Sequence, residues 1–293
     1  MRLRWLLLAP LGFASPVAAQ APPPAAESSE IIVQGHRYRD QDVSDFIDAL
    51  TQTRMGGQLS KFDWAVCPAA VGLSEHHRRA IAARMRQVAA AAGIKVAEVS
   101  CRPNALVIVT RDKKQLIPAL RKKYPAYFKD ALGDRIKPPN QAGPVTVWHV
   151  EGRLDSNGIA AAQDRESKYY IVESYDSSRL IPASRPAFAA GILVVELKAL
   201  AGLTATQLAD YAAMRLFART DPARLKNGSA PTILHAIDAP MGSAVPITLT
   251  HWDLGFLRAL YSAGPDQFAN RQRNEMKRAL RQDLRKVQDR PER

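Results

Sequence analysis

The chain has 293 residues, with 41 Lys and Arg against 28 Asp and Glu, and therefore a formal net charge of +13. A balance of this size concerns solubility and partners rather than the fold. Beyond the N-terminal segment no stretch approaches the roughly 18 apolar residues of a transmembrane helix, so the sequence predicts no membrane span in the mature protein and leaves enough chain for one sizeable domain or two lobes.

The N-terminus, MRLRWLLLAPLGFASPVAAQAPPP, has the three parts of a secretory signal. Arg2 and Arg4 form the charged start, residues 5–14 the apolar run, and residues 17–19 the small-residue cleavage site. We expect cleavage after Ala19 and a periplasmic or secreted protein; a retained anchor is the alternative. The mature protein then carries 39 basic and 28 acidic residues, a net charge of +11.

Residues 20–30 are rich in Pro, Ala and Ser, which is typical of a flexible tether. Residues 31–290 are expected to form a single α+β domain. It begins with a short strand at 31–34 and a helix at 44–53. The Pro- and Gly-containing loop at 137–144 is a possible boundary between two lobes.

Residues 62–110 form the clearest predicted unit. Ser74 is a suitable helix N-cap and Gly93 a suitable residue just after the helix, and apolar residues recur between them at helical spacing. The runs IKVAEV at 94–99 and ALVIVT at 105–110 predict two strands joined by a tight loop. The N-terminal half is therefore expected to contain a helix plus a β-hairpin.

Cys67 and Cys101 are the two cysteines of the chain. In an oxidising compartment two cysteines are most simply a disulfide. A free pair, a redox site or a metal site is the alternative, but C-x-x-C spacing is absent and no His closely flanks either residue.

The second half predicts a buried strand followed by helices. A basic helix at 112–123, with Pro118 inside it, leads to strands at 145–152 and 168–174. The run AFAAGILVVEL at 187–197 is almost continuously apolar, which is typical of a central strand buried on both faces. The predicted helices that follow lie at 204–219, 250–261 and 266–287.

Two segments concentrate the positive charge. RDKKQLIPALRKKY has six basic residues against one acid, and RQRNEMKRALRQDLRKVQDRPER has nine against four. Either segment could simply be a solvated helix face. In an exported protein the expected anionic partners are lipopolysaccharide, phospholipid head groups and cell-wall polymers. Nucleic acid is not expected, because no aromatic residues are interleaved for stacking on bases.

Sequence templates for catalysis are absent. There is no G-x-S-x-G, no S-x-x-K, no phosphate loop and no H-E-x-x-H, so we expect neither cofactor nor metal. His76 and His77 are adjacent and are expected to face solvent. The remaining candidates for acid, base or ligand roles are His149 with Glu151 two residues later on one strand face, Asp210, His235 and His251.

Residues 186–262 resemble the C-terminal half of a zincin-like, metallopeptidase-like domain. A buried strand, an apolar helix and the segment TILHAID are followed by LTHWDLGFLRALY, in which Asp253, Leu257, Leu260 and Tyr261 match the zincin pattern. The helix supplies Gln207, Asp210 and Tyr211 where His, Glu and His would be needed, so the resemblance implies a scaffold without zinc ligands.

The whole mature chain is also similar to a family of uncharacterised exported alphaproteobacterial proteins of sphingomonad type. A buried core helix explains residues 204–217 as well as the zincin-like layout does, because a helix that is apolar all round is a buried one. Asp210 would then need a partner from elsewhere, since Arg215 and Arg219 lie far around the helix from it.

These observations favour an exported, non-catalytic protein that binds an anionic or cell-envelope partner. A periplasmic hydrolase is the first alternative, and convergence of three of the candidate residues in one cleft would support it. A structural envelope protein is the second, and exposure of the apolar stripe from Met276 to Leu284 would support that.

Overall fold

The computed structural model describes residues 38–51, 53, 57–129, 142–164, 166, 170–172, 182–225, 230–240, 243–265 and 267–288. These residues belong to one compact unit, Ile31–Arg293. The predicted signal, tether and first strand, and most of the loop at 137–144, lie outside the described residues. No helix within the described ranges has both the length and the apolar character needed to cross a bilayer.

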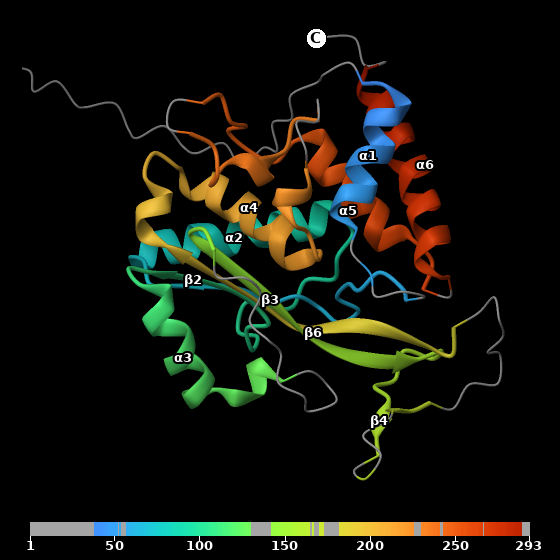
Figure 1. The fold of residues 1–293 in the computed structure, drawn as a ribbon, viewed down its shortest axis with the longest axis horizontal. Coiled ribbons are helices and arrows are strands. Elements are labelled where there is room, and N and C mark those ends of the chain that lie inside the picture. Colours follow the sequence, from blue (N-terminus) through green and yellow to red (C-terminus); the bar gives the residue numbers. More distant parts are fainter. Residues whose placement is uncertain are drawn as a thin grey trace, which may run out of the picture. The chain divides into compact units, whose positions relative to one another are not determined.

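A mixed four-stranded sheet forms the centre of the fold (Figure 1). The strands lie in the order β1 (Pro68–Val71), β2 (Ala105–Thr110), β6 (Ser184–Glu196) and β3 (Val145–Asp155). The first three run parallel, and β3 is antiparallel to β6 at the edge. A second small sheet pairs β4 (Ala162–Gln163) with β5 (Tyr170–Ile171), which is the described part of the strand predicted at 168–174.

Helices cover both faces of this sheet (Figure 1). One face carries α2 and α4, and the other carries α3 and the 3₁₀ turn η1; α1, α5 and α6 pack against one another beside the first layer. Short 3₁₀ turns connect several of these elements. The bounds of the helices are α1 Asp40–Leu50, α2 Glu75–Ala91, α3 Lys113–Lys123, α4 Ala205–Phe217, α5 His251–Ser262 and α6 Ala269–Gln288. The bounds of the 3₁₀ turns are η1 Pro125–Phe128, η2 Leu197–Leu200, η3 Pro222–Arg224 and η4 Ile233–His235.

Two hydrophobic clusters lie on the two faces of β6. Leu193 and Val195 pack with α2 and α4, whereas Ile192 and Val194 pack with α3. Successive strand side chains point to opposite faces, so a central strand with a helix layer on each side must be apolar at every position. The strand predicted from the run at 187–197 is confirmed, and so is the α+β class.

The predicted β-hairpin is wrong. β2 pairs in parallel with both β1 and β6, so β1, α2 and β2 form a βαβ unit. The run at 94–99 forms only an isolated bridge, Val66↔Val96, and Val99 is 89 % exposed. Apolar alternation over six residues does not distinguish a strand from an extended connection, and the chain needs such a connection to return from α2 to the start of β2.

Local signals for the helices are confirmed. The Ser74 hydroxyl accepts a hydrogen bond from the His77 amide at the start of α2, and Gly93 follows the helix with a φ of 74°. Pro118 lies inside α3, as predicted. On α6 the stripe Met276, Leu280 and Leu284 is buried against the rest of the core, so it is not available to an external partner.

A disulfide joins Cys67 and Cys101, as predicted. Cys67 directly precedes β1, and Cys101 lies in the turn before β2. The bond therefore joins the segments that lead into the two neighbouring parallel strands, across a sequence separation of 34 residues. A loop of that length contributes about 3–4 kcal/mol to stability in the chain-entropy model.

We predict that Cys101→Ser lowers the free energy of unfolding by about 3–4 kcal/mol, because the unfolded chain is no longer constrained. Urea denaturation of the oxidised protein and the variant measures the difference. Ser100→Ala, an exposed neighbour, should leave stability unchanged. Equal stability of the oxidised protein and Cys101→Ser would contradict the prediction.

Candidate functional site

His149 lies on β3 opposite Gly191 of β6 and faces the end of α4. Its Nε2 lies 3.0 Å from the Leu216 carbonyl oxygen, and its ring stacks on Phe188 with centroids 4.1 Å apart. A Cβ on Gly191 would come within 3.3 Å of the His149 ring and 3.1 Å of the Leu216 side chain. The glycine therefore provides the space in which the imidazole packs under α4.

The pKa of His149 is lowered to about 3, first by burial and then by the charge of Arg219. Because a carbonyl oxygen only accepts, the neutral imidazole donates its Nε2 proton to Leu216. A general base works best with a pKa near the operating pH. His149 therefore fits a structural role at the β3–α4 contact better than a proton-transfer role.

Glu151 forms an ion pair with Arg219 at 2.7 Å, just beyond the C-terminal end of α4. A register shift between Val150 and Glu151 interrupts the regular alternation of β3. The Arg219 guanidinium also lies 5.9 Å from the centre of the Phe188 ring. His149 and Glu151 are thus neighbours around Arg219, but each has its own structural partner.

Asp210 is fully buried in the middle of α4 and lies at the centre of a polar cluster in the core. Its carboxylate accepts two hydrogen bonds from Arg84 of α2, at 2.7 and 3.0 Å. The Thr248 hydroxyl and the Leu249 amide donate to it at 2.7 Å each. The partner that Asp210 requires does come from another element. Nothing in the sequence around Arg84 distinguishes it from the solvated arginines of α2.

The other polar positions of α4 are also engaged in structural contacts. Gln207 completes a capping box with Thr204 and donates to the Pro246 carbonyl oxygen at 2.9 Å. The Tyr211 hydroxyl accepts a hydrogen bond from Arg215 at 3.0 Å. The three residues at the zinc-helix positions of the zincin-like layout thus all contribute to helix capping or core packing.

Asp253 is a second buried carboxylate. It accepts hydrogen bonds from the Thr232 hydroxyl at 2.5 Å, the Ile233 amide at 2.9 Å and the Thr250 amide at 3.0 Å. Burial raises the pKa of Asp253 to about 6, against the effect of these donors. Asp253 is the third residue of α5, where it completes a capping box with Thr250 and holds η4 against the helix. The T-x-x-D spacing is the sequence signal for such a box.

The two remaining histidine candidates occupy other positions. His235 is exposed at the end of η4, and His251 is half-buried at the start of α5. His76 and His77 are exposed, as expected. Within the described part of the chain, no three His, Cys, Asp or Glu side chains are grouped so that they could hold a metal ion.

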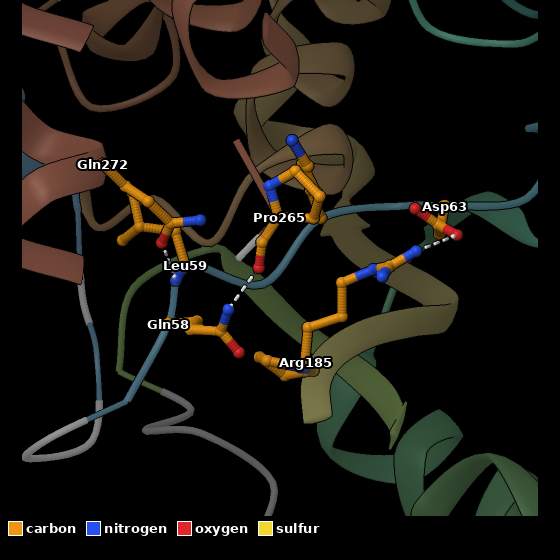
Figure 2. Close-up of a pocket in the computed structure, with 8 residues that line it drawn as sticks. Gln58, Leu59, Asp63, Arg185, Pro265 and Gln272 are labelled. Carbon is orange, nitrogen blue, oxygen red and sulfur yellow. Dashed lines mark hydrogen bonds and ion pairs between the residues drawn. The ribbon is translucent and has the colours of Figure 1, made fainter. Parts of the chain in front are cut away.

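A small cavity is lined by residues of the segment 58–63 together with Arg185, Pro265 and Gln272 (Figure 2). The Gln58 side chain donates to the Pro265 carbonyl oxygen, and the Leu59 amide donates to the Gln272 side chain. Arg185 is paired with Asp63. The cavity volume of about 10 Å³ suffices for about one water molecule, whereas ligand pockets are typically about 300–1,000 Å³. It is therefore no substrate pocket.

Lys61 lines this cavity and caps α5. Its Nζ donates to the carbonyl oxygens of Leu260, Tyr261 and Ala263 at 3.1, 3.2 and 2.8 Å. Burial lowers the pKa of Lys61 to about 8, but the cation suits the negative end of the helix. Nothing in the sequence around Lys61 indicated this contact.

Two basic surfaces remain as candidate sites for a partner. Along α6 a groove of about 750 Å³ is lined mainly by polar and basic side chains, including Arg271, Arg278 and Ser44 of α1. On the opposite side of the sheet, the outer face of α3 exposes Lys114, Lys122 and other polar residues.

No match to this chain is found among family models, curated proteins or solved structures. The contacts within the chain are therefore the basis for its functional interpretation. Asp210, Glu151 and His149, three of the candidate acid, base or ligand residues, have structural partners within the chain. Apart from the buried Lys113, the basic side chains of α3 and α6 lie at the surface.

We predict that Asp210→Ala lowers the free energy of unfolding by about 3–5 kcal/mol, because Arg84 would remain buried without its counter-charge. Urea denaturation measures the change. The double variant Arg84→Met/Asp210→Leu should recover much of the loss, and Asp45→Ala on the exposed face of α1 should have little effect. A cost for Asp210→Ala similar to that for Asp45→Ala would show that the pair is not needed for the fold.

His149 generates a prediction about acid stability. Since its pKa is about 3 when folded and about 6.5 when unfolded, the unfolded chain takes up the proton first as the pH falls. Stability is then lost progressively below about pH 6.5. Between pH 7 and pH 5 this loss amounts to about 2 kcal/mol.

His149→Gln keeps a donor for Leu216 but cannot titrate, so its stability should fall by about 2 kcal/mol less over the same pH interval. Denaturation curves of both proteins at pH 7 and pH 5 provide the comparison, and other titrating groups cancel in the difference. Identical pH dependence in the two proteins would show that the imidazole is not held neutral.

Proposed function

We propose that the protein is exported to the periplasm and acts there as a non-catalytic binding protein for an anionic component of the cell envelope. The N-terminal sequence pattern and the disulfide support the compartment. The net charge of +11 after removal of the signal supports the class of partner. In an exported protein, the abundant anions are the phosphate and carboxylate groups of lipids and wall polymers.

One observation carries the non-catalytic part of the proposal. Three of the five candidate groups are engaged with partners in the same chain: Asp210 with Arg84, Glu151 with Arg219, and His149 with the Leu216 carbonyl. The other two, His235 and His251, lie on η4 and α5. A catalytic group must be within hydrogen-bond reach of a substrate, and the buried Asp210 and His149 have their partners inside the core. If the zincin-like layout reflects kinship, the protein is a pseudoenzyme on that scaffold.

Binding to two classes of anion tests the proposal. The exported protein, with its N-terminus defined by intact mass, is titrated with vesicles containing an anionic phospholipid and with a soluble polyphosphate. We expect binding to at least one of them at about 100 mM salt. The logarithm of the affinity should fall with the logarithm of the salt concentration, because bound counterions are released.

Neutral phosphatidylcholine vesicles are the control for apolar adsorption. Absence of salt-sensitive binding to both anions would contradict the proposal. Elemental analysis of the same preparation examines the hydrolase alternative: one zinc per chain, lost in Asp210→Ala or His235→Ala, would favour that alternative instead.

A further inference from the structure

The segment around α3 combines high positive charge with few acids. Between residues 111 and 129 the sequence has one acid, Asp112, whose side chain accepts a hydrogen bond from the Gln115 amide at 3.0 Å as the helix N-cap. Six cations of this segment form no ion pair with any described residue. They are Arg111, Lys114, Arg121, Lys122, Lys123 and Lys129.

The charge on α6 is balanced much more closely. Lys277 is paired with Asp48 at 2.7 Å, and both Arg281 and Arg285 lie within 4 Å of Asp40. α1 carries four aspartates, at 40, 42, 45 and 48, and no basic residue, and it packs against α6. Three cations of α6 therefore hold α1, and the positive field that α6 presents to a partner is reduced.

Helix stability explains only part of the charge on α3. Arg121, Lys122 and Lys123 occupy the last turn, where the helix dipole favours cations. Lys113 and Lys114 occupy the first turn, where the dipole disfavours them. Lys113 is buried, and its amine donates to Thr146 at 3.0 Å, whereas Lys114 is exposed and forms no ion pair with a described residue. Helix stability therefore does not explain the charge at Lys114.

The position of α3 leaves its outer face on the surface. α3 is the one α-helix of the described residues on its side of the sheet (Figure 1). Tyr124 follows the last turn with 46 % of its surface exposed, beside Lys122 and Lys123. An exposed tyrosine among lysines is typical of surfaces that contact the interfacial region of a bilayer.

We propose that the outer face of α3, from Lys114 to Tyr124, docks the protein onto the anionic phospholipid head groups of a membrane. This inference rests on the proposed function and names both the surface and the source of the anion. Each basic residue close to such a membrane strengthens partitioning by a factor of about five. Three exposed lysines then account for a factor of about 100.

Two charge-matched variants test the proposal. Lys114→Gln/Lys122→Gln/Lys123→Gln removes three cations from α3, and Arg271→Gln/Arg278→Gln/Lys286→Gln removes three from α6. All six side chains are exposed, so both proteins should melt within a few degrees of the parent. Binding of the exported proteins to vesicles with about 30 % anionic phospholipid is measured by co-sedimentation at fixed salt.

We expect the α3 variant to bind about 100-fold more weakly than the parent and the α6 variant only a few-fold more weakly. A Lys114→Arg/Lys122→Arg/Lys123→Arg variant, which keeps the charge, should bind like the parent. If the α3 and α6 variants lose affinity equally, or the α6 variant loses more, net charge or α6 is responsible and the docking surface is wrong. If the parent binds polyphosphate but not vesicles, the lipid surface is wrong while the proposed function stands.

Discussion

The buried ion pair between Arg84 and Asp210 is the contact on which the arrangement of the core depends. It joins α2 to α4, the two helices that cover one face of the sheet. Removing two charges from water is costly, and the cost is offset only where further hydrogen bonds satisfy them. Here Thr248 and the Leu249 amide supply those bonds, so the pair also fixes the segment that leads into α5.

The same principle operates at two other places in the interior. Asp253 holds η4 and the start of α5 through amide and hydroxyl donors, and Lys61 binds the carbonyl groups at the end of α5. Each buried charge thus attaches an irregular segment to a helix end. The charged groups Asp210, Asp253 and Lys61 thus form hydrogen bonds with backbone and side-chain partners of the same chain.

The basic residues of α6 and of α3 differ in how many of them form ion pairs. α1 brings four aspartates beside α6, and ion pairs such as Lys277 with Asp48 use part of the basic charge to hold the helices together. Around α3, six cations have no ion-pair partner among the described residues: Arg111, Lys114, Arg121, Lys122, Lys123 and Lys129. Two segments that are equally basic in sequence are therefore different in electrostatic potential, because the potential depends on the sum of all nearby charges rather than on one helix.

The sequence by itself determined the features that depend on neighbouring residues. The Ser74 cap, the end of α2 at Gly93 and the two-sided burial of the strand around Leu193 follow from local hydrogen bonding and side-chain alternation. The pairing of Cys67 with Cys101 followed from there being two cysteines. Local patterns of this kind are visible at separations of a few residues.

Only the tertiary structure decided how distant segments meet. It placed β2 in parallel between β1 and β6 instead of in a hairpin, supplied Arg84 to Asp210 across 126 residues, and set α1 against α6. The candidate residues His149 and Asp210 were found by residue type, but their environments were not. The burial, partners and pKa of a side chain are set by elements that fold against it from elsewhere in the chain, and no spacing within one segment records them.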